Sequence, residues 1–286
     1  MKNSRARAEE VLNGLKRLPA MPAPVLRVIQ LAGDPNSAAG EIAECISTEP
    51  SLTTDVLRVA NSAYYGVPGE VTNVRMGVIM LGTTTIRSLA MMAAAYTWFE
   101  QPELCGRRGR AMWDHALSTA IFAGALARRY APTVEEEAFC CGLLHDLGKI
   151  ILTVSLTSQY EAILERANSR RIPDAEAERM ALGFDHSDVG GILAERWGLP
   201  AMLREVVRHH HNPRDAQEHR AFAEFVHAGD YLYWRMAEGE AFDPARRAVE
   251  PEVARKFELE NQERIEALFD VANAKREALS SVLKAA

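Results

Sequence analysis

Cysteine and long apolar runs are scarce in this chain of 286 residues, and its 33 lysines and arginines do not offset its 39 acidic residues. Its four cysteines have no CxxC spacing, which indicates neither a disulfide framework nor a cysteine-based structural zinc site. The formal net charge of −6 argues against nucleic acid as the main partner, because such partners usually require a basic face. The apolar run at 89–99 is too short to span a bilayer, and the charged N-terminus lacks a signal core. We therefore expect a cytoplasmic protein without membrane contacts.

Alternating strand patterns are also missing, and helical periodicity dominates nearly everywhere. This predicts an all-α fold, in which an N-terminal helical subdomain packs on a helical bundle and a C-terminal helical extension follows. The polar stretch at 100–110 contains proline and glycine, so the predicted parts are 1–103, 104–240 and 241–286. Helices are predicted at about 6–18, 82–98, 112–130 and 135–154, the last interrupted near Gly148. Asp185 is a predicted N-cap, with Asp188 as its carboxylate partner.

Histidine and aspartate, by contrast, recur at one site per predicted helix through the middle of the chain. The positions are His115, the pair His145-Asp146, His186, the histidine run 209–211, and Asp230. Side chains placed in this way could converge on one point from the walls of a helical bundle. Imidazole nitrogen and carboxylate oxygen are typical ligands of zinc, manganese and iron. A metal centre is therefore the first hypothesis about function.

Ordered sequence blocks also run through the chain, over about residues 15 to 235. Those in the first half are Leu18-Pro19-Ala20-Met21-Pro22, Glu49-Pro50-Ser51-Leu52, Ala60-Asn61-Ser62-Ala63-Tyr64-Tyr65-Gly66 and Leu81-Gly82. Those in the second half are Trp113-Asp114-His115, Gly142-Leu143-Leu144-His145-Asp146-Leu147-Gly148-Lys149, His186-Ser187-Asp188-Val189-Gly190, Trp197-Gly198-Leu199-Pro200, His210-His211-Asn212-Pro213 and Ala228-Gly229-Asp230. In this order they resemble the HDOD family, the HD-related output domain of bacterial signalling proteins, within the HD superfamily of metal-dependent phosphohydrolases.

The resemblance implies a ligand set for one or two divalent ions of iron, manganese or zinc. It implies that His115, His145, Asp146 and Asp230 hold one ion. By similarity to the two-metal HD-GYP cyclic di-GMP phosphodiesterases, a second ion is implied at His186, His210 and His211, with Asp146 as the bridge. Lys149 matches a lysine close to the substrate phosphate in those relatives. Asp146 and Lys149 are thus the residues that the resemblance implies for catalysis.

Two functional hypotheses follow. The preferred one is a bacterial regulatory or output module that acts through protein or small-ligand contacts and carries an HD-type metal site. The alternative is a metal-dependent phosphohydrolase or phosphodiesterase acting on a nucleotide or cyclic dinucleotide. HD-GYP relatives follow their histidine pair with a glutamate and a Gly-Tyr-Pro block, whereas Asn212 and Pro213 follow it here, which weakens cyclic di-GMP hydrolysis. A signalling partner and a nucleotide or phosphate ligand are implied; turnover and oligomeric state stay open.

Less specific interpretations exist for the same residues. A lone helical histidine is more often a core or surface residue than a ligand, and a hydrated remnant of a metal site is the main alternative. We expect His209, His219 and His227 to lie outside the ligand set. Lys149 is equally compatible with a solvated helix position, and a structural turn role is favoured for Asn61. Burying several ionisable groups together without a cation is costly, which favours a filled centre.

Overall fold

A computed structural model describes residues 4–15, 23–32, 39–62, 65–101, 105 and 108–283. Every regular element within these ranges is a helix, which confirms the predicted all-α fold. The sequence block at 18–22, residues 63–64 of the Asn61 block, and the predicted boundary at 103/104 lie outside the described residues. The first half contains α1 (Ser4–Gly14), α2 (Ala23–Ala32), α3 (Ala39–Ser47), α4 (Pro50–Ala60), α5 (Val74–Leu81) and α6 (Thr83–Phe99).

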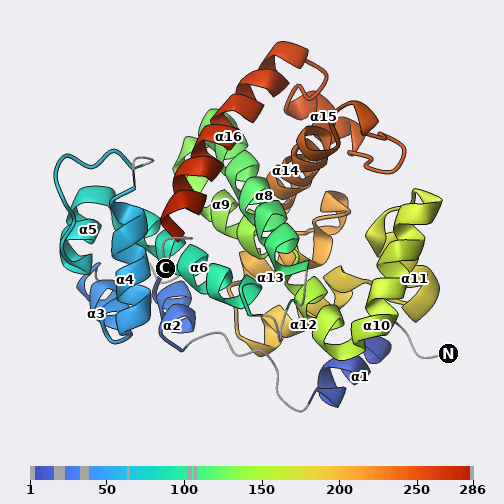
Figure 1. Cartoon of the computed structure of the whole chain (residues 1–286), viewed down its shortest axis with the longest axis horizontal. Coiled ribbons are helices and arrows are strands. Elements are labelled where there is room, and N and C mark those ends of the chain that lie inside the picture. The colour runs from blue at the N-terminus through green and yellow to red at the C-terminus, as the bar shows by residue number, and fades with distance from the viewer. Residues whose placement is uncertain are drawn as a thin grey trace.

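The second half contains the remaining helices. They are α8 (Gly109–Tyr130), α9 (Glu135–Leu144), α10 (Leu147–Arg170), α11 (Asp174–Leu182), α12 (His186–Arg196), α13 (Ala201–His209), α14 (Arg220–Glu238), α15 (Pro251–Lys256) and α16 (Gln262–Leu283), with short 3₁₀ turns η2 (Pro132–Val134), η3 (Pro213–Asp215) and η4 (Gly239–Ala241). Figure 1 shows α2 to α5 grouped at one end of the molecule and α10 to α12 at the other. Helices α8, α9 and α14 pack most closely together and form the centre of the bundle.

Helix α6 joins the two halves. It is apolar around most of its circumference and rich in alanine, a pattern typical of a helix buried on all sides. It packs on α2, α4 and α5 of the first half and on α9 and α8 of the second. Nearby, the Asn61 side chain donates to the carbonyl of Val71 and accepts from its amide at 2.9 and 2.7 Å. Asn61 therefore has the structural turn role that was expected.

The helix predicted over 135–154 is interrupted near Gly148 as expected, at His145 and Asp146 between α9 and α10. Its second part continues well past residue 154 to Arg170, with a kink at Thr157, where φ is 35°. His145 keeps helical φ and ψ, whereas Asp146, with φ of −96° and ψ of 18°, does not, so the break begins at the residue shared by both ligand sets.

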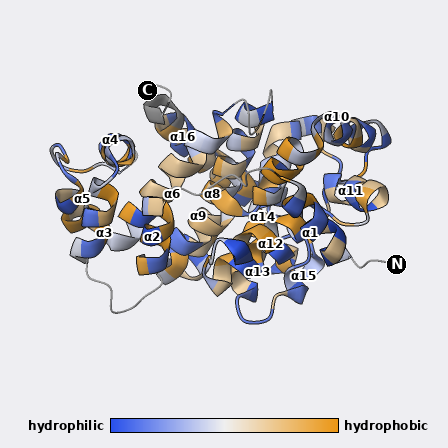
Figure 2. Cartoon of the chain, turned by 90° about the horizontal axis from the view of Figure 1, so that it is seen from below, coloured by the Kyte–Doolittle hydropathy of each residue, from blue (hydrophilic) through white to orange (hydrophobic). Residues whose placement is uncertain are grey.

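Both ends of the chain pack on the bundle. Helix α1 lies against α12 and α10, far along the molecule from α2, and α16 contacts both α8 and α4 (Figure 1). In the C-terminal extension, Val253, Phe257, Ile265 and Ala272 are buried against the bundle. Figure 2 shows hydrophilic colouring on the peripheral α1 and α15, whereas the inner α8 and α9 are largely apolar.

One helical segment, 132–170, is long and apolar enough to cross a membrane by length and composition alone. However, 72% of its apolar window is buried inside the protein. Much of its apolar surface comes from α9, which packs between α8 and α14. Its hydrophobicity is therefore accounted for by its place in the bundle.

Candidate metal centre

The first ligand set forms where α8, the α9–α10 turn and α14 meet. The Nε2 atom of His115 lies 3.1 Å from Nε2 of His145 and 3.1 Å from Oδ2 of Asp146. Asp230, on α14, places Oδ1 3.5 Å from the same His115 nitrogen. His115, His145 and Asp146 offer ligand atoms that all lie within 4.8 Å of one another. Four residues implied for one ion are thus brought together from three separate elements.

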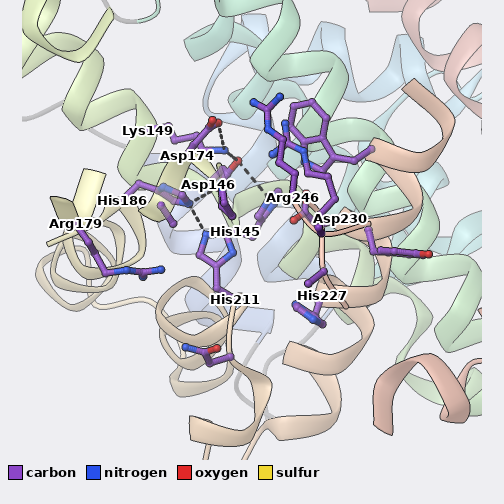
Figure 3. A pocket seen from close by; sticks show the side chains of 18 residues that line it. His145, Asp146, Lys149, Asp174, Arg179, His186, His211, His227, Asp230 and Arg246 are labelled. Carbon is purple, nitrogen blue, oxygen red and sulfur yellow. Dashed lines mark hydrogen bonds and ion pairs between the residues drawn. The ribbon is translucent and has the colours of Figure 1, made fainter. Parts of the chain in front are cut away.

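The second ligand set lies beside the first. His186 begins α12, and its Nε2 is 2.9 Å from Nε2 of His211, just beyond the end of α13. His186, His210 and His211 also satisfy the 4.8 Å grouping. The other carboxylate oxygen of Asp146, Oδ1, lies 3.1 Å from Nε2 of His186 and 3.7 Å from Nε2 of His210. Asp146 therefore directs one oxygen to each set of histidines. Figure 3 shows Asp146 with His145, His186 and His211 around the pocket.

Hydrogen bonds at Nδ1 orient several of these rings. His145 Nδ1 lies 2.7 Å from the carbonyl of Gly142, and His210 Nδ1 lies 3.0 Å from the carbonyl of Val207. A carbonyl can only accept, so these contacts require a proton on Nδ1 and leave Nε2 as the free lone pair. That is the tautomer of a metal ligand whose outer nitrogen is anchored. With Nδ1 anchored in this way, the Nε2 atoms of His145 and His210 lie 3.4 and 3.7 Å from the Asp146 carboxylate.

The chemistry of the grouped atoms fits a divalent cation. Nε2 of His210 and Oδ1 of Asp230 are both buried, and neither has a hydrogen-bond partner among the described residues. Buried polar atoms of this kind are costly unless something satisfies them. Nitrogen and oxygen ligands without a thiolate suit manganese, iron or zinc. These residues could therefore hold a metal ion.

Two carboxylates and a lysine complete the electrostatics of the site. Nζ of Lys149 lies 2.7 Å from Oδ2 of Asp146 and 4.0 Å from Oδ2 of Asp174. Burial lowers the pKa of Lys149, but these two carboxylates outweigh burial and raise it. Burial likewise raises the pKa of Asp146, yet His145, Lys149 and His186 together hold it well below the usual range. Lys149 is thus a charged member of the site and not a solvated helix residue.

A pocket opens directly onto both ligand sets (Figure 3). Its walls add three arginines, Arg179, Arg246 and Arg247, to Lys149. Arg246 and Arg247 belong to the segment 242–250, between η4 and α15, and Nε of Arg246 is buried without a hydrogen-bond partner among the described residues. Arg179 is paired with Asp185, the N-cap of α12. Basic side chains therefore line the pocket beside its carboxylates, and Arg179 and Arg247 are themselves paired with Asp185 and Glu238.

A second cavity also reaches this centre. It shares Asp146, Lys149, Asp174 and Trp234 with the first pocket, and its own walls are mainly aromatic and apolar: Phe99, Met112, Tyr160, Leu164 and Tyr233. Trp234 lines both cavities, and the guanidinium of Arg247 stacks 3.4 Å above its ring. The first pocket thus has more of the basic side chains and the second more of the aromatic ones, and Lys149 and Trp234 line both.

The histidines expected to lie outside the ligand set have other roles. His227 lines the pocket, but its Nδ1 bonds the carbonyl of His210 at 2.8 Å and its Nε2 accepts from the amide of Glu250 at 3.1 Å. Both of its ring nitrogens are therefore used within the protein. His209 ends α13, and neither it nor His219 lines the site pocket.

Sequence reasoning missed several residues of the site. Glu178 bonds His186, Tyr160 bonds Glu178, and Arg246 reaches the pocket from outside the bundle. None of them belongs to a motif block, and Glu178 reads as an ordinary glutamate on an amphipathic helix. Only the proximity of a glutamate eight residues before a candidate ligand could have drawn attention to it.

Stability of the metal-free protein should fall as the pH drops below about 6.5. Burial lowers the pKa of His115, and lowers those of His210 and His211 well below the ordinary value. The unfolded chain therefore binds more protons than the native one below pH 6.5, which favours unfolding by at most about 1.4 kcal/mol per pH unit for each such histidine. His186 opposes this slope, but only weakly below pH 6.5. Burial lowers its pKa, yet Glu178 and Asp146 outweigh burial and raise it to about 10, so the native state keeps this proton. The unfolded chain gains the same proton only as the pH falls through about 6.5.

Thermal unfolding of metal-free protein from pH 6.5 to 5.5 checks this. We expect the midpoint temperature to decrease steadily with acidification. A midpoint that is constant or rises over this interval would contradict the burial of neutral imidazoles at this centre.

Solved structures share the fold over nearly the whole chain. An HDOD domain protein of unknown function from Geobacter sulfurreducens matches with a TM-score of 0.78 and 23% identity, over 98% of each chain. A "Putative phosphohydrolase" from Shewanella amazonensis SB2B matches with a TM-score of 0.72 and 22% identity, over 98% of this chain and 97% of that one. A "Putative signal transduction protein" from Marinobacter aquaeolei VT8 matches with a TM-score of 0.76 and 23% identity, over 99% and 66%. At identities of 22–23%, this structural similarity establishes that the chains share a fold.

Sequence comparisons identify related chains as well. The profile of the HDOD domain matches residues 18–213. An uncharacterized protein of Treponema pallidum (strain Nichols) is 25% identical over 212 residues, which cover 74% of this chain. The matched region is 41% of that relative, so this chain aligns with only about two-fifths of its length.

Proposed function

Because the chain belongs to the HDOD domain family, we propose that it is a signalling protein whose HD-type centre binds two divalent ions and hydrolyses a phosphoester. The observation that carries this proposal is the Asp146 carboxylate, which directs one oxygen to each of two histidine sets. A carboxylate in that position can bridge two cations. Without cations, so many buried ionisable groups would be difficult to accommodate.

Each ion would have its own ligands in this proposal. His115, His145 and Asp230 would hold the first and His186, His210 and His211 the second, with Asp146 shared. Two bound divalent ions would supply Lewis acidity, which lowers the pKa of a water molecule and offsets the charge of the phosphoryl oxygens. The hydrogen bonds from Nδ1 to the carbonyls of Gly142 and Val207 would keep the His145 and His210 rings oriented toward the ions.

The remaining pocket residues suit a phosphate group. Lys149 and Arg246 carry positive charge beside the ligand sets, and the unpartnered Nε of Arg246 is a donor available to an anion. Trp234, Tyr233 and Phe99 form an aromatic wall in the adjoining cavity. An organic phosphate, with a flat or apolar group attached to the phosphoryl centre, would use both cavities.

A regulatory protein that binds this ligand without turnover is the second candidate. The segment 242–250 supports it, because Arg247 stacks on Trp234 and Glu250 bonds His227, so the segment covers the pocket. A ligand that contacted Arg246 or Arg247 would be sensed directly by this segment. A signalling partner could then bind the segment 242–250 in one of its positions and not in the other.

A hydrolysis screen with manganese-loaded protein separates the two candidates. Phosphate release from aryl phosphomonoesters, aryl phosphodiesters, nucleotides and cyclic dinucleotides would be measured. We expect turnover of at least one class, and Arg246→Ala should raise KM about tenfold or more because a charge-assisted hydrogen bond is lost. Arg128→Ala, an exposed α8 arginine paired with Glu135, is the matched control and should change nothing. Saturable binding of one of these compounds without phosphate release would favour the regulatory candidate and refute hydrolysis.

A further inference from the structure

Glu178 is a fully buried carboxylate that belongs to neither ligand set. It lies on α11, and its exposed fraction is 0%. Its Oε2 accepts from Nδ1 of His186 at 2.7 Å and from the backbone amide of the same residue at 2.7 Å. Its Oε1 accepts from the hydroxyl of Tyr160, on α10, at 2.8 Å. Both oxygens are therefore committed, and the chain of bonds runs from α10 through α11 to a candidate ligand on α12.

This contact differs from those of the other anchored rings. His145 and His210 each donate Nδ1–H to a neutral backbone carbonyl from the preceding turn. His186 instead donates to an ionisable side chain from another helix. A carboxylate acceptor makes the imidazole more electron-rich at Nε2 and so a stronger ligand than a carbonyl acceptor does. The second ligand set thus contains a histidine whose Nδ1 is hydrogen-bonded to a carboxylate, which neither His145 nor His210 has.

Capping of α12 does not account for Glu178. Asp185 already caps that helix, because its side chain accepts from the amides of Ser187 and Asp188, and the Asp188 side chain returns a contact to Asp185. Glu178 could satisfy the amide of His186 without touching the ring. The additional contact with Nδ1 fixes the direction of the ring, and with it the direction of Nε2.

We propose that Glu178 is a positioning residue that fixes His186 as an Nε2 ligand and makes His186, His210 and His211 the tighter of the two metal sites. The inference rests on the proposed dinuclear centre. Tyr160 holds the second oxygen of Glu178 and so keeps the carboxylate turned toward His186. The first set should fill second, since nothing comparable reinforces His115, whose Nδ1 is buried without a hydrogen-bond partner among the described residues.

Titration of metal-free protein with Mn²⁺, followed by the EPR signal of the free ion, tests this. Wild-type protein should bind two ions in two steps. Glu178→Gln keeps the side-chain volume and an oxygen that can accept from His186, but removes the charge. We expect it to weaken the tighter step about 10- to 100-fold and leave the weaker step within about twofold. Tyr160→Phe should weaken the same step by less.

Two controls distinguish positioning from a general loss of structure. Glu224→Gln removes another buried glutamate, paired with Arg220 and Lys256, and should leave both steps unchanged. In a His211→Ala background, where the second set is incomplete, Glu178→Gln should no longer affect the remaining step. Equal weakening of both steps, or no change in either, would overturn the inference alone. Wild-type protein that binds no Mn²⁺ would instead refute the proposed function, and the inference with it.

Discussion

Replacement of Asp146 with asparagine is expected to abolish binding of both ions and to lower phosphoester hydrolysis by more than about 100-fold. Asparagine keeps the shape of the side chain but has one carbonyl oxygen where the carboxylate has two. Its amide group would then direct hydrogens at one set of histidines. The exchange also removes the partner of Lys149, whose Nζ lies 2.7 Å from Oδ2. Elemental analysis of the purified variant, with steady-state kinetics, measures both effects.

Asp114→Asn is a suitable control for this change. Asp114 precedes His115 on α8 and is only half-buried. It is an aspartate of similar sequence context that does not line either cavity at the centre. We expect this variant to retain both ions. If Asp146→Asn also retained both ions, the bridging role of Asp146 would be wrong.

The second large effect is expected on folding, from Gly148→Ala. Helices α10 and α12 cross in close contact at Gly148 of α10 and Gly190 of α12. A Cβ at Gly148 would overlap the carbonyl oxygen of His186. On the facing side, a Cβ at Gly190 would lie 2.8 Å from Cγ1 of Val207 and 3.0 Å from the amide of Gly148. Both neighbours include backbone, which cannot rotate away. We expect Gly148→Ala to lower the free energy of unfolding by about 3 kcal/mol or more.

The same substitution should also affect the metal site, because the crossing holds Asp146 against His186. Separation of α10 from α12 would weaken the second ligand set before the first. Gly40→Ala is the control, since a Cβ at that helical position meets nothing within 4 Å. That variant should be neutral or slightly more stable, as alanine favours helix over glycine by about 1 kcal/mol. Denaturant unfolding of both variants decides the matter; an unchanged midpoint for Gly148→Ala would contradict the close crossing.

The sequence was sufficient to predict the helical fold and the residues that meet at the centre. Periodicity alone favoured helices, and the ordered histidine and aspartate blocks indicated a common site. The structure brings His115, His145, Asp146 and Asp230 together, with His186, His210 and His211 beside them. This succeeded because each of these residues sits in a block whose local pattern is distinctive.

Other parts of the site depend on tertiary packing that no local pattern encodes. The helix break was predicted only as near Gly148; its position at His145 and Asp146 lies between α9, which packs on α8, and α10, which packs on α12. Glu178 shows the same limit: its burial depends on where α11 lies relative to α12, and an isolated helix does not specify that. Arg246 reaches the pocket from a segment without regular structure, whose path depends on contacts with α14 and His227.

Anomalous diffraction from crystals of the manganese-loaded protein tests the dinuclear centre most directly. The account predicts two anomalous peaks on opposite sides of the Asp146 carboxylate, one next to His115 and one next to His186. Manganese at full occupancy elsewhere in the protein, or the absence of a peak beside Asp146 in protein soaked with excess Mn²⁺, would contradict it.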